Sequence, residues 1–118
     1  MKKYTTKEIE NTLILLNKTI ENCQKIQPKF QSGSSQYTLL ENRIKALKIS
    51  ISLIKNEDNI TYEQETLKET LKPIYSIISK CRKAQAKYQE NRSYQNRLMN
   101  IIRGMEIAEE KIIERINK

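Results

Sequence analysis

Basic, hydroxyl and aromatic side chains recur at comparable positions in the two halves of this chain, and their shared chemistry is anion binding. Guanidinium and ammonium groups bind phosphates, helix N-termini and hydroxyl groups donate hydrogen bonds to them, and tyrosine rings stack on bases. The expected ligand-binding residues are Ser35, Tyr37, Arg43, Lys45, Ser93, Tyr94, Arg97 and Arg103. The pattern predicts a site for an anionic, nucleotide-like partner.

Residues for catalysis or metal binding are scarce. The chain has no His and a single Asp, Asp58, which excludes Ser-His-Asp and Cys-His arrangements and every His-based metal site. Glu109 and Glu110 are adjacent and do not share a helix face, which indicates a solvated surface. We therefore expect a non-enzymatic protein with no metal and no cofactor, in which Cys23 and Cys81 pack as apolar core residues.

Composition restricts the fold to a small helical domain. The 118 residues suffice for one domain, spanning 1–118, and two Gly with two Pro are too few for the turns of a β-sandwich or barrel. The formal net charge is +8, which favours nucleic acid or another anion as partner. No apolar run is long enough to span a membrane, and the first residues lack the apolar core of a signal peptide. We expect a cytoplasmic location and no membrane partner.

The two halves of the sequence resemble each other at an offset of 58 residues. From the pair Thr12/Thr70 to the pair Ile54/Ile112 the register continues without a gap, and fourteen of the 43 pairs are identical. A shared helical pattern alone does not explain this number of identities. The sequence predicts an internal duplication, with unit one at 5–55, a linker at 56–60 and unit two at 61–117.

Each unit carries two apolar stripes with alternating spacings of four and three, typical of two helices. Polar breaks at 31–35, 55–59 and 90–93 separate the helices. Pairs of a Thr with Glu or Gln three residues later predict helix starts at Thr5 and at Thr61. Pro73 predicts a kink or restart within the third helix. The expected fold is an all-α, antiparallel four-helix bundle built from two tandem αα-hairpins.

In such a bundle both hairpin loops lie at one end, which therefore collects the positive charge. The segments Asn22–Lys45 and Lys80–Arg103 carry +3 and +6, so the rest of the chain is close to neutral. Gln27 and Gln85 interrupt the apolar stripes near this end. Two interpretations stay open for them: pairing across a pseudo-twofold axis, or lining a polar cavity.

The second expected helix has more apolar surface than one bundle face buries. Its additional face is formed by Leu39, Ala46, Ile49 and Leu53. A homodimer through this face, or binding of another protein to it, is the alternative to anion binding.

Two segments resemble parts of known small proteins. Ser34–Leu47 with Ile49 and Leu53–Ile54 is similar to a segment of short helical proteins from low-GC Gram-positive bacteria and their mobile elements, and Leu71–Gln85 is similar to the segment that precedes it there. That resemblance implies no activity. In size and helical content the chain also resembles small phage proteins that sequester nucleotide immune signals. This resemblance implies a counter-defence role in which a signalling nucleotide or short nucleic acid is held.

Overall fold

Four α-helices and one short 3₁₀ turn make up the regular structure of the computed structural model, which describes residues 3–57 and 60–118. The elements are α1 (Thr6–Ile26), η1 (Gln27–Lys29), α2 (Ser35–Ile54), α3 (Gln64–Lys87) and α4 (Arg92–Ile116). No strand occurs in the described ranges, so the all-α class predicted from the sequence is confirmed.

Side-chain caps fix where three of the helices begin. At α1, the Glu8 N–H donates to Thr5 Oγ1 at 3.0 Å and the Thr5 N–H donates to the Glu8 carboxylate at 3.1 Å, as predicted. The side chains of Ser34 and Asn91 accept from backbone N–H groups three residues further on, at 3.2 and 3.0 Å. Because Asn91 is the cap of α4, the Ser93 hydroxyl has no capping role.

The start of α3 differs from the prediction, and the helix does not restart at Pro73. Its N-cap is Glu63, which makes no side-chain cap, so the helix does not begin at a capping box of Thr61 and Gln64. The Gln64 amide instead donates to the carbonyl oxygen of Ile116 at 3.0 Å and joins α3 to the end of α4. The helix also continues through Pro73 without interruption.

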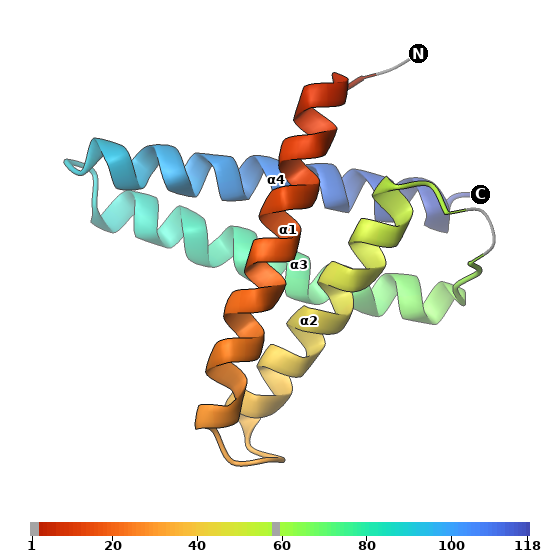
Figure 1. Cartoon of the computed structure of the whole chain (residues 1–118), viewed down its shortest axis with the longest axis horizontal. Coiled ribbons are helices and arrows are strands. Elements are labelled where there is room, and N and C mark those ends of the chain that lie inside the picture. Colours follow the sequence, from red (N-terminus) through yellow and green to blue (C-terminus); the bar gives the residue numbers. More distant parts are fainter. Residues whose placement is uncertain (1–2, 58–59) are drawn as a thin grey trace.

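The two helical hairpins cross each other. In Figure 1, α1 descends and α2 returns upward, whereas α3 and α4 run across them. The molecule measures 41 × 37 × 20 Å. Two of these dimensions are similar, as expected for two crossed hairpins. Helices of 20–25 residues aligned in one bundle would give a single long dimension. The expected alignment of all four helix axes, with both loops at one end, is therefore wrong.

Helix α2 occupies the centre of the crossing and contacts α1, α3 and α4. Ala46, Ile49 and Leu53 are buried with exposed fractions of 2, 7 and 5%. The additional apolar face of α2 is thus covered by helices of its own chain, and the predicted interface at these three residues is wrong. Only Leu39 of that set is exposed.

The core is built from residues that correspond at the offset of 58. Leu16 and Ile74 form one such pair, Leu47 and Met105 another, and all four side chains are fully buried. Cys23 and Cys81 are also equally buried, at 7% each. These three pairs of corresponding positions are therefore equally buried in the two hairpins.

Candidate functional site

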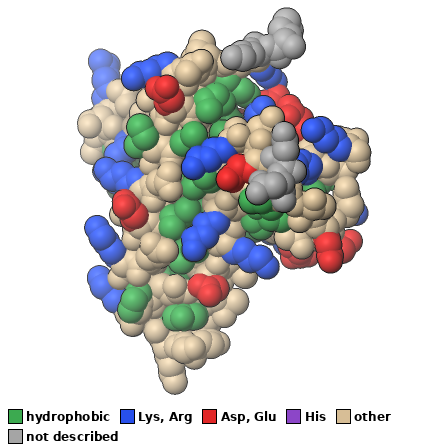
Figure 2. All heavy atoms as spheres, turned by 45° about the vertical axis from the view of Figure 1, so that its right-hand side comes forward, with side chains coloured by type: hydrophobic (Ala, Val, Ile, Leu, Met, Phe, Trp, Pro, Cys, Tyr) green, Lys and Arg blue, Asp and Glu red, His purple; other side chains and the backbone are tan. Residues whose placement is uncertain are grey.

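The predicted ligand-binding residues lie in several separate places instead of one. Ser35 and Tyr37 belong to the first tip, defined as residues 27–37, and Ser93, Tyr94 and Arg97 belong to the second tip, defined as residues 80–97. The remaining three, Arg43, Lys45 and Arg103, lie on the helices away from the tips. Figure 1 shows the two tips at different extremities of the molecule, and in Figure 2 Lys and Arg side chains are spread over the visible face. The predicted single basic end does not exist.

The first tip is closed by its own hydrogen bonds. The Gln27 side-chain amide donates to the Glu41 carboxylate at 2.9 Å and to the Tyr37 carbonyl at 3.3 Å. Among the residues that the structure describes, the Ser35 hydroxyl bonds only to the neighbouring Gln36 side chain, at 3.3 Å. Gln27 therefore ties α2 to η1, and its predicted pairing with Gln85 across an axis is wrong because the two lie at different tips.

The second tip combines two tyrosine rings with exposed cations. The rings of Tyr88 and Tyr94 meet edge to face, with centroids 5.5 Å apart and planes at 74°. Lys87 Nζ lies 5.4 Å from the centroid of Tyr88, and Arg97 Cζ lies 6.0 Å from that of Tyr94. The Gln95 amide donates to two carbonyls of the loop and of α3, at 2.7 and 2.9 Å, so the loop is held in place. Tyr88 nevertheless remains 45% exposed.

The cations of the second tip are not neutralised within the chain. Lys80, Lys83, Lys87, Arg92 and Arg97 are all exposed. None forms an ion pair with a carboxylate of the residues that the structure describes. These charges are free to bind an external anion.

Arg43 lies between the two hairpins, beside both cysteines. One of its terminal nitrogens donates to Ser76 Oγ of α3 at 3.3 Å, and its buried Nε has no partner among the described residues. An unpaired buried donor costs about 1–3 kcal/mol. Burial raises the pKa of the Cys23 and Cys81 thiols, and the positive charge of Arg43 offsets part of this rise.

The two cysteines cannot form a disulfide. No Cα of α1 lies within 8 Å of a Cα of α3, and Cys23 and Cys81 lie on these two helices. A disulfide requires the Cα atoms to be about 4.4–6.8 Å apart. Buried thiols with raised pKa values are weak nucleophiles, in keeping with the expected packing role.

Two grooves lie where the hairpins cross, and their linings correspond at the offset of 58. The α2–α3 groove has a volume of about 480 Å³ and the α1–α4 groove about 420 Å³. Corresponding lining pairs are Asn42/Asn100, Lys45/Arg103, Ala46/Gly104, Thr66/Glu8, Thr70/Thr12 and Pro73/Leu15. The sequence patterns predict Lys45 and Arg103 as ligand-binding residues but do not single out Thr66 and Glu8, which line the opposite sides of the two grooves. The offset of 58 relates Thr66 to Glu8 and could have identified this pair.

A small residue on the second helix of each hairpin permits the close crossing. A Cβ atom built on Gly104 would lie 2.4 Å from Leu15 Cδ2, so α1 approaches α4 where a side chain is lacking. The corresponding residue Ala46 is 2% exposed in the α2–α3 groove. Small residues at these positions bring the hairpins together at both crossings.

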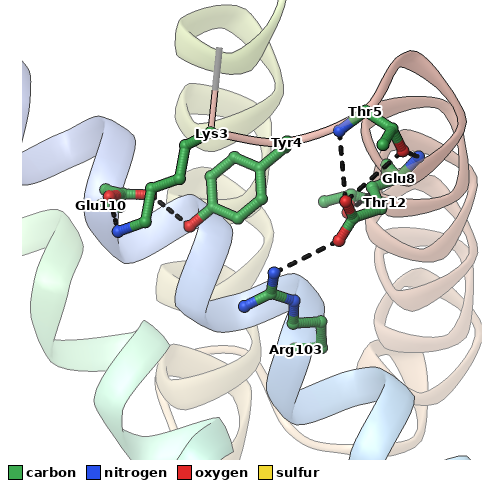
Figure 3. Close-up of polar contacts among 7 residues, drawn as sticks. All are labelled: Lys3, Tyr4, Thr5, Glu8, Thr12, Arg103 and Glu110. Atoms are coloured by element: carbon green, nitrogen blue, oxygen red, sulfur yellow. Dashed lines mark hydrogen bonds and ion pairs between the residues drawn. The ribbon is translucent and has the colours of Figure 1, made fainter. Parts of the chain in front are cut away.

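The segment before α1 covers the cation of the α1–α4 groove (Figure 3). Arg103 forms an ion pair with Glu8 at 3.2 Å, and its Cζ lies 5.0 Å from the centroid of the Tyr4 ring. The Tyr4 hydroxyl donates to the Glu110 carboxylate, and Lys3 Nζ pairs with the same group at 2.6 Å. Arg103 therefore has its counter-charge inside the chain and is a poor candidate for binding an external anion.

The contact between Tyr4 and Glu110 should make the stability of the fold depend on pH in two ranges. Burial, followed by the bond to Glu110, raises the pKa of Tyr4 from 10.0 to about 12, so the contact stabilises the fold below pH 10 and is lost as the pH approaches 12. Hydrogen bonds from Lys3 and Tyr4 lower the pKa of Glu110 below 4.5, so its contribution is present above pH 4.5 and is lost on acidification. Absorbance at 295 nm should show a tyrosine that ionises near pH 12 and whose contribution is lost in Tyr4→Phe. An unchanged titration curve in Tyr4→Phe would contradict the assignment.

Introducing an acid at Thr66 should stabilise the protein. Thr66 corresponds to Glu8, so Thr66→Glu places a carboxylate opposite Lys45 as Glu8 lies opposite Arg103. The new pair, together with an acid in the first turn of α3, should add about 0.5–1 kcal/mol at low salt. Urea denaturation at two salt concentrations measures the gain. Thr66→Gln serves as the uncharged control, and an equal gain in both variants would contradict ion pairing.

Comparison with known proteins gives no relatives: no family model, no curated protein and no solved structure matches this chain. Within the described residues, none of the helices has the length and apolar character needed to cross a membrane.

Proposed function

We propose that the chain is a non-enzymatic binding protein whose second tip holds a short single strand of nucleic acid. The observation that carries this proposal is that the second tip combines the Tyr88 and Tyr94 rings with five exposed cations that form no ion pair within the described residues, two of which, Lys87 and Arg97, lie beside the rings. Cations that follow a phosphate backbone together with aromatic faces for bases are the usual elements of single-strand binding.

The form of the second tip supports an extended ligand over a small enclosed one. Its depression is shallow and is lined by the loop residues 86–91. A small nucleotide held tightly would need a concave pocket that buries most of its surface. A strand can instead lie along the tip, contact several cations and stack a base on the exposed Tyr88. The resemblance to small phage proteins that sequester nucleotide signals implies a signalling nucleotide as the ligand. The same residues would bind that ligand.

We infer that the two hairpins are duplicated units related by a pseudo-twofold axis. The matched linings of the two grooves and the equal burial of corresponding core residues support this inference. Under this arrangement the tips are also equivalents, and only the second combines two tyrosines with several unpaired cations. Anion binding at the tip would then be a specialisation of the second unit.

The protein-interaction alternative has lost its main support. Three of the four residues proposed for that surface are buried within the chain, and only Leu39 is accessible. The anion-binding proposal uses residues that are exposed.

Fluorescence anisotropy with a labelled oligothymidylate tests the proposal. Each phosphate contact on a single strand contributes a slope of about −0.7 to the logarithmic dependence of affinity on salt. With three to five cations in contact we expect a slope of roughly −2 to −3.5. The absence of binding at 20 mM salt would overturn the proposal. A cyclic dinucleotide that displaces the strand at equimolar concentration would overturn the choice of a strand and identify a small nucleotide as the ligand.

A further inference from the structure

The α2–α3 groove has the size and lining of a small-molecule site that is separate from the second tip. Its volume of about 480 Å³ falls within the range of about 300–1,000 Å³ found for ligand pockets. Leu39, Ala46 and Pro73 supply apolar surface, and Asn42 and Ser76 supply hydrogen-bonding groups. Such a lining suits a ligand with one apolar part and one polar group.

A positive charge adjoins this groove at Ser76, because Arg43 does not line the groove itself but bonds to Ser76, which does. Arg43 reaches Ser76 with one terminal nitrogen at 3.3 Å, a neutral hydroxyl being its only hydrogen-bond partner among the described residues. No described carboxylate lies within 4.0 Å of the Arg43 guanidinium, and its Nε is buried without an acceptor. A guanidinium in these surroundings favours an incoming anion.

The carboxylates of the groove lie at its other end. Glu65 and Glu69 line it from the first turns of α3, and Glu69 is paired with Lys72 at 3.0 Å. Glu69 and Ser76 are seven residues apart on one helix, which corresponds to about 10 Å along its axis. An anion at Ser76 is therefore distant from both acids, and a ligand would bind with its charged group at the Arg43 end.

In the α1–α4 groove, the corresponding cation already has an ion-pair partner within the chain. There the cation from the second helix, Arg103, is paired with Glu8 of the opposite wall at 3.2 Å. In the α2–α3 groove the corresponding residues are Lys45 and Thr66, so the internal acid has been replaced by a neutral side chain. Both cations that α2 contributes near this groove, Arg43 and Lys45, lack an ion-pair partner among the described residues.

We propose that the α2–α3 groove binds a small organic anion, with its carboxylate or phosphate group on Arg43, Ser76 and Asn42. The apolar part of the ligand lies on Leu39, Ala46 and Pro73. This site shares no residue with the second tip, so the proposal does not depend on whether the protein binds nucleic acid.

Titration of the full ¹⁵N-labelled chain with benzoate and with phenyl phosphate, followed by amide chemical shifts, tests the proposal. We expect saturable shifts at Asn42, Ser76 and their neighbours, and at least fivefold weaker binding of benzyl alcohol, which lacks the charge. The stronger of the two anions identifies the preferred headgroup. Shifts that do not saturate, or that follow the exposed cations over the whole surface, would overturn the proposal.

Matched variants locate the site. Arg43→Met should weaken anion binding at least tenfold, whereas Lys48→Met, which removes an exposed charge from the same helix, should leave it unchanged. Because Arg43 is half-buried, Leu39→Glu provides a second variant at an exposed position; it places a negative charge at the groove and should also weaken binding at least fivefold. Equal affinity of the parent protein and Leu39→Glu would overturn the assignment.

Discussion

Replacement of Leu47 by alanine should lower the free energy of unfolding by about 3–4 kcal/mol. The Leu47 side chain is fully buried, and its helix α2 contacts the three other helices, so the cavity has little room to collapse. A loss of this size is a large part of the roughly 5–15 kcal/mol that stabilises an ordinary domain. Urea denaturation followed by circular dichroism measures the change.

Two further truncations serve as controls for Leu47→Ala. Met105 corresponds to Leu47 at the offset of 58 and is also fully buried, so Met105→Ala should cost a similar amount. Ile14 is 67% exposed, and Ile14→Ala should change the free energy of unfolding by less than about 0.5 kcal/mol. A cost for Leu47→Ala near that of Ile14→Ala would contradict the central position of α2.

Local signals in the sequence predicted the individual helices well. The capping pair of Thr5 and Glu8 starts α1, and the apolar stripe through Leu16 and Ile20 is buried as its spacing indicated. The similar pair of Thr61 and Gln64 does not form a capping box, and the Gln64 amide instead bonds to the end of α4. A residue type that suits a cap can equally serve a tertiary contact, and the local pattern does not distinguish the two.

The arrangement of the hairpins could not be read from periodicity. A stripe shows which face of a helix is buried, but not which helix covers it. The stripe therefore favours an intermolecular surface at Ile49 and Leu53, although helices of the same chain cover α2 at these positions. For the same reason, the periodicity wrongly predicts that both tips lie at one end of the molecule. Once the hairpins cross, Tyr37 and Tyr94 are separated, and the candidate site divides into the second tip and the α2–α3 groove.

Removal of three cations from the second tip should reduce affinity for single-stranded DNA about 100-fold at 0.1 M salt. The variant is Lys83→Gln with Lys87→Gln and Arg97→Gln, all at exposed positions. Three lost phosphate contacts, each contributing about 0.7 to the salt slope, make the slope about 2 units less steep. With equal affinities of the two proteins at 1 M salt, this difference in slope corresponds to about two decades of affinity at 0.1 M salt. Anisotropy at several salt concentrations measures both quantities.

A variant of equal charge separates local contacts from the net charge of the protein. Lys7→Gln with Lys48→Gln and Lys68→Gln removes the same three charges from exposed positions on α1, α2 and α3 outside the second tip. Because contact with phosphate is local, while the long-range field is screened over about 10 Å at 0.1 M salt, this control should lose less than about threefold. Equal losses in both triple variants would show that only the overall charge attracts the strand. A difference in salt slope would assign the phosphate contacts to the second tip, and Tyr88→Ala would then test whether a base stacks there.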